Sequence, residues 1–300
     1  MLSVTASFKI LDMKLQPECV ACIIAQVKTV TQMLHLPQMK AEAAIQETYD
    51  FLKTANYEGC TPESMGDLWQ ILLCSIGESD PYAAIKSLCN QEAERLVPST
   101  SEKIAHANDP FGIALKYAVA GNLIDYGLEH PVSIEEQNAL IDAIASTDFS
   151  IDDSVKLRDA LHGAKSLLYL GDNAGEIVFD RLLIEQINEQ YPQISVTFVV
   201  KGSAVLNDAT MRDALEAGLD KVSRVIDNGD YSPGTVLLRS SEAFRHEFAA
   251  SDVVLSKGQG NFESLNEENK ENLFFLFTAK CDTICAAAGV PKLSIVCMKN

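Results

Sequence analysis

The chain has 300 residues, of which 47% are hydrophobic and 22% are charged, and its formal net charge at pH 7 is −18. This is the composition of a globular protein long enough for two domains or one large one. The acidic excess argues against nucleic acid as the main partner, because phosphate backbones bind to basic surfaces. It does not exclude a small anionic substrate, since a metal ion or a few lysines can reverse the sign of the charge locally.

The sequence contains no run of roughly 18 apolar residues, the length that a membrane span requires. Its first residues also lack the order of charged, apolar and small residues that marks a signal peptide. We therefore expect a cytoplasmic protein that does not associate with a membrane. In that setting the eight cysteines are expected to remain thiols instead of forming disulfides.

Residues 1–155 are expected to form a mainly helical domain. Apolar residues recur at helical spacing along six segments, and several of these begin with a proline or a capping residue. The predicted helices occupy residues 17–36, 37–55, 61–77, 80–97, 109–127 and 133–146. In the fifth, Asn122 and Asp125 lie on one face of an otherwise apolar helix, where we expect them to brace the functional loops or to join neighbouring helices.

Residues 156–300 show a different pattern, in which short runs rich in valine, leucine and isoleucine alternate with amphipathic stretches. The predicted strands occupy residues 166–170, 195–200, 221–226, 252–256, 273–277 and 293–298. Strands that alternate with helices predict a largely parallel sheet with helices on both faces. Right-handed crossovers then bring the strand-to-helix loops together along one edge of that sheet.

Polar residues gather where these strands end, and ligands of open α/β sheets bind at that edge. The segment from Gly171 to Glu176 follows the first predicted strand, and Asn207 and Asp208 lie in the loop after the second. The segment from Lys257 to Glu263 follows the fourth strand, and Lys280 follows the fifth. Four loops on one edge therefore offer carboxylates, amides and lysines.

The oxygen donors of Asp172, Asn173 and Asp208 suit a hard divalent cation such as Mg²⁺ or Mn²⁺. Two carboxylates and one amide leave coordination positions open for water and substrate. Lysines nearby suit the phosphoryl oxygens of a substrate that shares the metal, and glycines allow backbone N–H groups to approach an anion closely. Together these features predict metal-assisted transfer of a phosphoryl group to water.

Each loop by itself has a simpler explanation. The Gly171 to Asn173 segment can be a tight turn, and Asn207 with Asp208 can be an ordinary helix cap. The loop that begins at Lys257 contains G-x-G but not the full G-x-G-x-x-G pattern, so it is weak support for a dinucleotide site. The recurrence of such residues at successive strand ends is what favours a functional site.

The same segments resemble a known family, the damage-control metal-phosphatases, formerly a domain of unknown function. The matching segments are GDNAGE at 171–176, LND at 206–208, KGQGNFE at 257–263 and FTAK at 277–280. PECVAC at 17–22 and AGNLIDYG at 120–127 resemble the subgroup of that family that carries an early cysteine pair. In other branches an arginine precedes the position of Thr278, where this chain has Phe277.

The resemblance implies a helical N-terminal domain and a Rossmann-like three-layer α/β/α domain that holds one divalent metal. The metal is expected to be Mn²⁺ or Mg²⁺, with Co²⁺ or Ni²⁺ as further possibilities, and its implied ligands are Asp172, Asn173 and Asp208. The implied partner is a small phosphorylated metabolite, such as a sugar phosphate or a phosphopantetheine-like compound, intact or damaged. The residues expected to bind it are Lys257, Gly258, Gln259, Gly260, Asn261, Glu263 and Lys280.

The expected activity is hydrolysis of a phosphomonoester, with Asp172, Asp208 and Lys280 as catalytic residues. Either a water molecule or the carboxylate of Asp172 can attack the phosphoryl group. Lys280, together with Lys257, is expected to offset charge on the phosphoryl oxygens. The alternatives are a non-catalytic protein that binds a nucleotide or metabolite with the same loops, and a sugar-phosphate isomerase or transferase.

Cys19 and Cys22 form a C-x-x-C motif at the start of a predicted helix, which places both sulfurs on one face. The favoured interpretation is a pair of buried apolar thiols. The alternative is a second site, for a soft metal or for redox regulation, with help from Cys60, Cys74 or Cys89.

Overall fold

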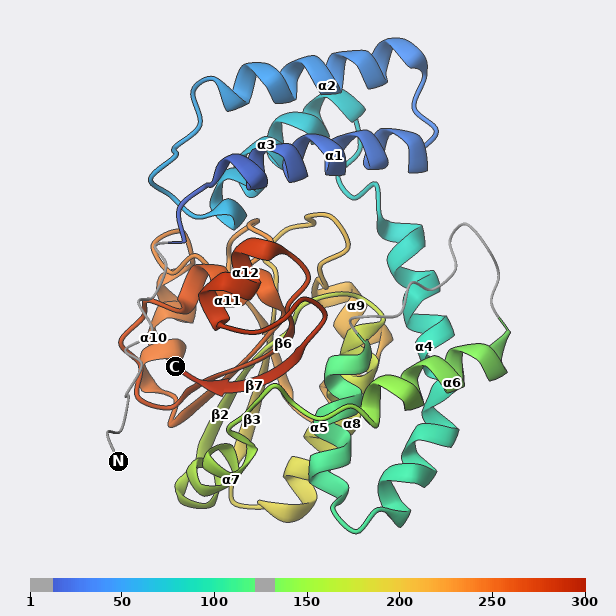
Figure 1. The fold of residues 1–300 in the computed structure, drawn as a ribbon, viewed down its shortest axis with the longest axis vertical. Coiled ribbons are helices and arrows are strands. Elements are labelled where there is room, and N and C mark those ends of the chain that lie inside the picture. Colours follow the sequence, from blue (N-terminus) through green and yellow to red (C-terminus); the bar gives the residue numbers. More distant parts are fainter. Residues whose placement is uncertain (1–12, 122–132) are drawn as a thin grey trace.

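The computed structural model describes residues 13–121 and 133–300. Its centre is a seven-stranded sheet with the order β1-β7-β6-β5-β2-β3-β4 (Figure 1). The strands are β1 (Ile151–Asp152), β2 (Ser166–Leu170), β3 (Ser195–Val200), β4 (Arg224–Asp227), β5 (Val253–Lys257), β6 (Leu273–Thr278) and β7 (Ile295–Lys299). The six predicted strands all occur, with ends that shift by up to three residues.

Strands β2 to β6 run parallel, β7 runs antiparallel to β6, and β1 runs parallel to β7. The chain proceeds from β2 outward through β3 to β4, and then returns to place β5 and β6 on the other side of β2. The direction of strand order therefore reverses between β2 and β5. In open α/β sheets this reversal separates the loops that follow the two strands and creates a crevice for ligands.

The first three helices form a layer beyond the carboxyl ends of the strands (Figure 1). They are α1 (Pro17–Met33), α2 (Gln38–Leu52) and α3 (Thr61–Ile76). They pack around their own hydrophobic cluster, in which Leu68 and Trp69 are completely or almost completely buried. Val205, from the loop that follows β3, also belongs to this cluster and joins the layer to the sheet.

The next helices pack against one another and share a hydrophobic core with the sheet. They are α4 (Ala83–His106), α5 (Pro110–Ala120) and α6 (Ile134–Ala145), and they share one core with α8 (Glu176–Gln190) and the strands. Helix α5 is apolar on nearly all sides, so it is stable only where neighbours surround it. The hydrophobic clusters of the described residues thus separate α1 to α3 from the later helices. The expected domain boundary between residues 155 and 156 stays a prediction.

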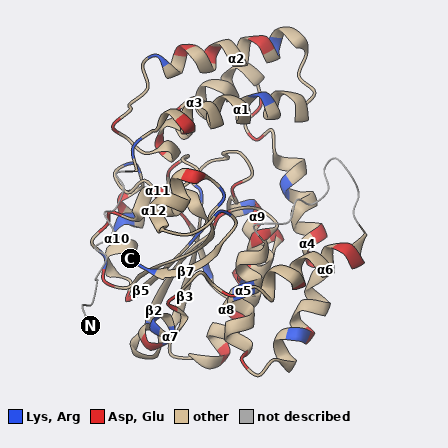
Figure 2. Cartoon of the chain, in the orientation of Figure 1, with Lys and Arg blue, Asp and Glu red and all other residues tan. Residues whose placement is uncertain are grey.

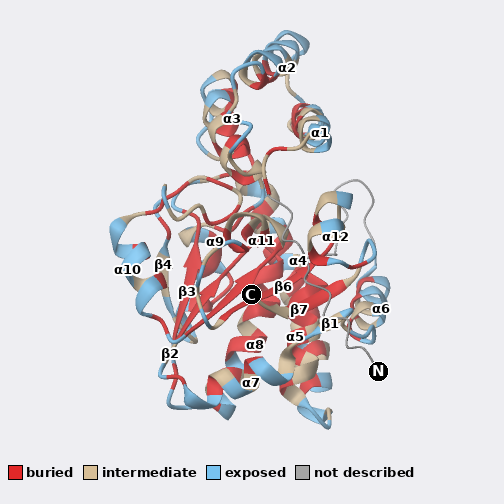
Figure 3. Ribbon diagram, turned by 60° about the vertical axis from the view of Figure 1, so that its left-hand side comes forward, coloured by how far each residue is buried: buried red, intermediate tan, exposed pale blue. Residues whose placement is uncertain are grey.

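The sheet is buried on both faces because successive side chains of each strand point to opposite sides. On β2, Leu167 and Tyr169 belong to the core with α5 and α8, whereas Leu168 and Leu170 belong to the core on the other face. Figure 3 shows the sheet and these two helices as the most continuously buried part of the molecule. The remaining helices are α7 (Ser154–Gly163), α9 (Met211–Glu216), α10 (Glu242–Ala250), α11 (Gln259–Leu265) and α12 (Asp282–Ala288).

The mixed α/β class with a mostly parallel sheet is therefore confirmed. The helix that begins at Pro110 is described as far as Ala120, so Asn122 and Asp125 lie outside the described residues. No helix in the described part of the chain combines the length and apolarity needed to cross a membrane. Acidic and basic residues are interspersed over the helices (Figure 2).

Candidate active site

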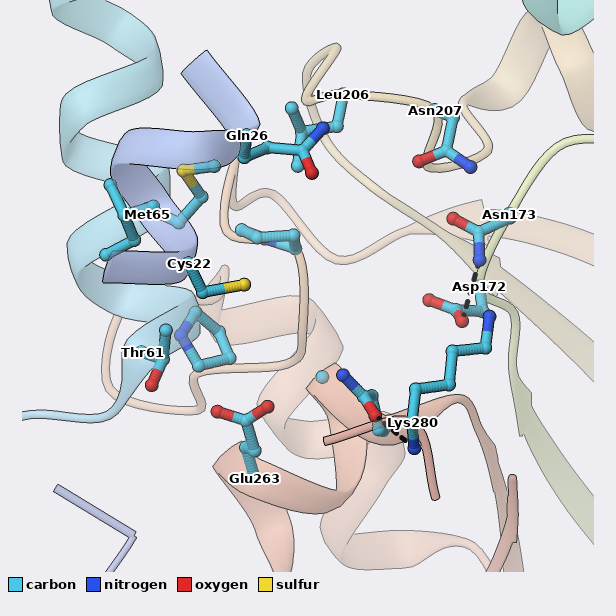
Figure 4. A pocket seen from close by; sticks show the side chains of 15 residues that line it. Cys22, Gln26, Thr61, Met65, Asp172, Asn173, Leu206, Asn207, Glu263 and Lys280 are labelled. Carbon is cyan, nitrogen blue, oxygen red and sulfur yellow. Dashed lines mark hydrogen bonds between the residues drawn. The ribbon is translucent and has the colours of Figure 1, made fainter. Parts of the chain in front are cut away.

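A cleft of about 330 Å³ separates helices α1 and α3 from the carboxyl ends of the strands. Apolar and polar groups both line it: Cys22, Gln26 and Met65 lie on the side of the helices, and Asp172 and Asn173 lie on the side of the strand ends (Figure 4). The lining residues are Cys22, Ile23, Gln26, Thr61, Pro62, Met65, Asp172, Asn173, Leu206, Asn207, Pro233, Gln259, Gly260, Glu263 and Lys280. The cleft lies at the reversal point of the sheet, where the fold predicts a ligand site.

Two loops that are distant in the sequence pair with each other at the floor of this cleft. Asn173 and Asp208 form an isolated antiparallel bridge. The N–H of Ala174 donates to the carbonyl of Asn207 at 3.0 Å, and the N–H of Ala209 donates to the carbonyl of Asp172 at 2.8 Å. Backbone hydrogen bonds thereby hold Asp172 and Asn173 opposite Asp208.

The carboxylate of Asp172 accepts a hydrogen bond from the side-chain amide of Asn173 at 3.0 Å. The amide oxygen of Asn173 is left to face the cleft, as Figure 4 shows. Asp172 follows β2 directly after Gly171, whose backbone lies against the ring of Phe198. The tight packing of this glycine positions the loop at the end of a buried strand.

Asp208 is buried and does not itself line the cleft, whereas the neighbouring Asn207 does. Its Oδ2 atom has no hydrogen-bond partner among the described residues, and it lies 3.5 Å from Nζ of Lys201. The pKa of Asp208 is raised to about 7, chiefly by burial and also by the negative charge of Asp172, while Lys201 opposes both. A second positive charge at this point would offset the cost of burying the ionised carboxylate and would also reduce its repulsion with Asp172.

This donor set fits a hard divalent cation. Two carboxylates and an amide oxygen converge, one carboxylate oxygen is buried without a hydrogen bond, and the two acidic groups repel each other. Oxygen ligands of this kind are those that Mg²⁺ and Mn²⁺ prefer. That Asp172, Asn173 and Asp208 bind a metal stays a prediction.

Lys280, Gln259 and Gly260 line the cleft beside these carboxylates, as expected for residues that contact a substrate. The backbone N–H of Lys280 donates to the side-chain oxygen of Gln259 at 3.1 Å, which ties the loop after β6 to the start of α11. The side chain of Lys280 extends toward Asp172 in Figure 4. A cationic group is thus aimed at the predicted metal site.

Glu263 lies on the wall farther from the strand ends, next to Thr61 of α3. Burial raises the pKa of Glu263 to about 7, although a hydrogen bond with Thr61 partly opposes this shift. Near neutral pH the carboxyl group can therefore both donate and accept hydrogen bonds. The cleft thus carries a titrating group close to its apolar wall.

The expectation that Lys257 contacts the substrate is wrong. Its side chain is fully buried, and Nζ donates to the carbonyl of Ala118 at 2.8 Å and to Glu176 at 2.6 Å, and also pairs with Asp180. Strand alternation is the reason, because Lys257 shares the face of β5 that packs under α5 and α8. The sequence correctly predicted that Lys257 lies at the end of a strand, but it did not show that the side chain points away from the cleft.

Asn261 and Gly258 also support the site without lining it. The side-chain amide of Asn261 donates to the carbonyl of Lys257 at 2.7 Å and to that of Gly171 at 3.3 Å, and its oxygen accepts from Thr235 at 2.8 Å. Gly258 adopts a φ of +78° and brings the backbone against Asp172. These residues connect the loops after β2 and β5 and fix their spacing.

The cysteine pair is not buried as expected. Cys22 is exposed and lines the cleft, and Cys19 is half-buried. The buried stripe of α1 consists of Ile23, Val27 and Val30, so Cys22 lies beside it and not within it. In residues 13–121 and 133–300, no group of three or more histidine, cysteine, aspartate or glutamate side chains is arranged to hold a metal ion.

Sequence reasoning did not select several residues that complete the site. Lys201 directly follows β3, and its position after a buried strand was the signal that could have identified it. Gln26, Thr61 and Met65 come from α1 and α3, where no motif distinguishes them from other helical residues. Only the packing of those helices over the strand ends brings them to the cleft.

Comparison with known proteins agrees with this architecture. A family model described as the damage-control phosphatase ARMT1-like domain matches residues 15–296. A damage-control phosphatase of Pyrococcus horikoshii is 33% identical over 96% of this chain and 99% of its own length. An uncharacterised protein of Methanocaldococcus jannaschii is 34% identical over 93% of both chains.

A solved structure has the same fold over nearly the whole chain. The crystal structure of a DUF89 family protein from Pyrococcus horikoshii superposes with a TM-score of 0.89 at 31% sequence identity. The match covers 96% of this chain and 99% of the other. A damage-control phosphatase of Archaeoglobus fulgidus is 28% identical over 93% of this chain and 96% of its own length. These similarities extend over the helical layer as well as the sheet.

Proposed function

Because the chain belongs to the damage-control phosphatase ARMT1-like family, we propose that it is a metal-dependent phosphatase of a small phosphorylated metabolite. The observation that carries this proposal is the convergence of Asp172 and Asn173 with Asp208 beside Lys280 at the end of a ligand cleft. Relatives that carry the name damage-control phosphatase support the phosphatase activity. The cleft and its donor set support the metal and the phosphorylated substrate.

The metal ligands of the proposed enzyme are Asp172, Asn173 and Asp208. A divalent cation bound there supplies Lewis-acid stabilisation for the negative charge of the phosphoryl group. Lys201 lies 3.5 Å from Asp208 and holds the carboxylate in place while its Nζ also donates to the carbonyl of Gly234 at 2.7 Å. The carboxylates thus keep one orientation when substrate enters.

Lys280 is the proposed contact for the phosphoryl oxygens. Its side chain extends toward Asp172, and Gln259 fixes its backbone through the hydrogen bond at 3.1 Å. A preorganised ammonium group stabilises the charge that spreads over the phosphoryl oxygens during transfer. The attacking group is either water or Asp172, and only the second leaves phosphate on the protein during turnover.

The organic part of the substrate is proposed to contact the opposite wall. Ile23, Met65 and Pro62 provide apolar surface, while Gln26 and Glu263 provide hydrogen-bonding groups. A volume of about 330 Å³ is at the lower end of the range for small-molecule sites. These features favour a small metabolite with both polar and apolar parts, in line with a sugar phosphate or a phosphopantetheine-like compound.

The decisive experiment is phosphate release from p-nitrophenyl phosphate and from a panel of phosphorylated metabolites. Purified protein would be stripped with a chelator and then supplied with Mn²⁺, Mg²⁺, Co²⁺ or Ni²⁺. We expect release only with added metal, and a loss of at least about 100-fold in kcat/KM for Asp172→Asn and Asp208→Asn. Asp252→Asn is the matched control, since this carboxylate binds the N–H groups of Lys165 and Ser166 at the other end of β2.

Absence of phosphate release with every metal and every compound, from correctly folded protein, would contradict the proposal and favour a non-catalytic binding protein. Rapid quenching during turnover, followed by mass spectrometry of the peptide that contains Asp172, separates the two nucleophiles. A phosphorylated peptide identifies Asp172 as the attacking group. Its absence at a time when product forms identifies water.

A further inference from the structure

Helix α4 contributes two buried polar side chains that reach both loops of the proposed metal site from behind the cleft. Lys86 and Asn90 are separated by four residues, so they lie one turn apart on the same face of the helix. Both are almost completely inaccessible to solvent, and neither lines the cleft. Burial of an amide and an ammonium group is costly, and their partners explain how the fold tolerates it.

Asn90 contacts the loop after β2 and, at the same time, the helix that directly follows the loop of Asp208. Its side-chain oxygen accepts a hydrogen bond of 2.6 Å from the N–H of Gly175, two residues after Asn173. Its side-chain nitrogen donates to the carbonyl of Asp213 at 3.3 Å, in the turn of α9 that follows Asp208. One planar amide therefore spans the segments that provide all three proposed metal ligands.

Lys86 supports the same arrangement with its charge. Nζ lies 2.9 Å from Oδ2 of Asp213 and 3.5 Å from the carbonyl of Asp208. The carboxylate of Asp213 in turn accepts hydrogen bonds from the backbone and hydroxyl groups of Thr210 at 2.9 and 2.6 Å. The chain between Asp208 and α9 is thus held to α4 at several points.

We propose that Asn90 is a positioning residue of the metal site, which sets the spacing between Asp172 and Asn173 on one loop and Asp208 on the other. The proposal rests on the function proposed above. The two loops also pair directly through the bonds of Ala174 and Ala209. The amide of Asn90 adds a third connection, which joins Gly175, next to Ala174, to Asp213 in the first turn of α9.

The physical reason is geometric. A divalent cation accepts its oxygen ligands only within a narrow range of distances, so a small change in loop spacing weakens binding strongly. Groups behind the ligands that hold them in place typically contribute about 10- to 100-fold to metal affinity. Asn90 is placed to supply that contribution without touching metal or substrate.

The test compares Asn90→Leu with wild type in two measurements. Leucine keeps the branched shape of asparagine but can form neither hydrogen bond. In metal-free protein, hydrogen–deuterium exchange should increase at Gly175 and in residues 207–213. In calorimetric titration with Mn²⁺, the dissociation constant should rise by about 10- to 100-fold, whereas phosphate release at saturating Mn²⁺ should recover in large part.

Asn188→Leu is the matched control. Asn188 on α8 also joins two segments through one side-chain bond, to the carbonyl of Val222 at 2.8 Å, but it lies toward the other end of the sheet. It should change neither loop exchange nor Mn²⁺ affinity. Asn90→Asp keeps the acceptor for Gly175 and should increase exchange there less than Asn90→Leu does.

Unchanged exchange in both loops of Asn90→Leu would overturn the proposal, as would an Mn²⁺ dissociation constant within about twofold of wild type. An equal effect in Asn188→Leu would show general destabilisation and would also overturn it. Failure of the proposed function has a different signature: wild-type protein would then bind no Mn²⁺ and release no phosphate. In that case the exchange data still decide whether Asn90 joins the loops.

Discussion

Gly258 and Asp172 approach each other so closely that a Cβ atom on Gly258 would lie 1.9 Å from Oδ2 of Asp172. The two residues come from the loops after β5 and β2, the strands on either side of the reversal point of the sheet. Gly258 also has a φ of +78°, a conformation that residues with a side chain rarely adopt. The position of the proposed catalytic carboxylate is thus tied to the absence of a side chain on a different loop.

Gly258→Ala should therefore lose activity more than stability. The new methyl group must displace the Asp172 carboxylate or the loop, and displacements of this size cost about 100-fold in rate. The backbone of Gly258 (φ +78°, ψ +159°) lies in a region that only glycine adopts readily, so alanine by itself costs roughly 1–3 kcal/mol there. Initial rates of phosphate release and thermal unfolding of the metal-free protein measure the two effects.

Gly77→Ala is the control that separates backbone strain from the steric clash with Asp172. Gly77 has a similar φ of +83°, but a Cβ atom there would meet nothing within 4 Å. Its backbone is left-handed helical (ψ +23°), so we expect alanine to cost roughly 1–2 kcal/mol while activity stays within about twofold of wild type, because only a backbone penalty remains. Equal loss of activity in the two variants would contradict the steric explanation.

The two lysines at the strand ends should respond to methionine substitution in opposite ways. Lys257→Met leaves the carboxylates of Glu176 and Asp180 buried without their cation, which typically costs about 3–5 kcal/mol. Lys280→Met should change stability little but reduce kcat/KM by about 100-fold, since it removes charge stabilisation at the phosphoryl group. Urea unfolding and steady-state kinetics distinguish the variants.

The reverse pattern, a stable Lys257→Met protein with a large kinetic defect, would indicate that Lys257 contacts the substrate. A Lys257→Met protein that fails to fold agrees with its structural role. In that case the kinetics of Lys280→Met still test the proposed contact of Lys280 with the phosphoryl group, because this variant is expected to fold.

The half-buried Glu263 should make stability depend on pH in a direction unusual for a carboxyl group. Its pKa is raised from 4.5 to about 7 by burial, so between these values the folded state holds a proton that the unfolded state has lost. Stability therefore falls as pH rises toward 7, and the full penalty is present above that value. Glu263→Gln mimics the protonated form and should escape this penalty.

Urea unfolding at about pH 5 and about pH 8 measures the effect. The advantage of Glu263→Gln over wild type should grow by about 2 kcal/mol between the two conditions. Glu136 provides a contrast, because the backbone N–H of Ser133 lowers its pKa and its contribution is lost as pH falls. A constant difference between wild type and Glu263→Gln would show that the carboxyl group is ionised throughout.

Cys22 should make the enzyme sensitive to thiol reagents. Its side chain is exposed and lines the cleft, so a maleimide attached there would obstruct substrate. Partial burial against the walls of the cleft raises the pKa of this thiol, with further contributions from Cys19 and Glu263, so modification should be slow at neutral pH and faster as pH rises. Residual phosphatase activity during incubation with N-ethylmaleimide gives the rate.

Cys22→Ser should be inactivated at least about tenfold more slowly than wild type, relative to its own initial activity. Cys74→Ser is the matched control, because Cys74 is also exposed but does not line the cleft. Protection by Cys74→Ser in place of Cys22→Ser would assign the sensitive thiol elsewhere.

The sequence by itself determined the elements of this protein and the segments that meet at the site. Short continuous apolar runs predicted the strands, because a strand that is buried on both faces needs apolar side chains at successive positions. Polar residues after those runs predicted Asp172, Asn173 and Lys280 as neighbours, since parallel strands bring their carboxyl ends to one edge. Capping residues such as Ser133 predicted helix starts for local reasons.

Only the tertiary structure decided which face each side chain uses and which helices complete the cleft. Lys257 is buried against α5 and α8 because of the parity of β5, and Cys22 borders the cleft because α1 buries a neighbouring stripe. The partition of the helices between two cores, and the contact of Asn90 with two loops, depend on packing between residues far apart in the chain. Spacing along a sequence fixes local periodicity, but contacts between distant segments are fixed by the total free energy of packing the whole chain.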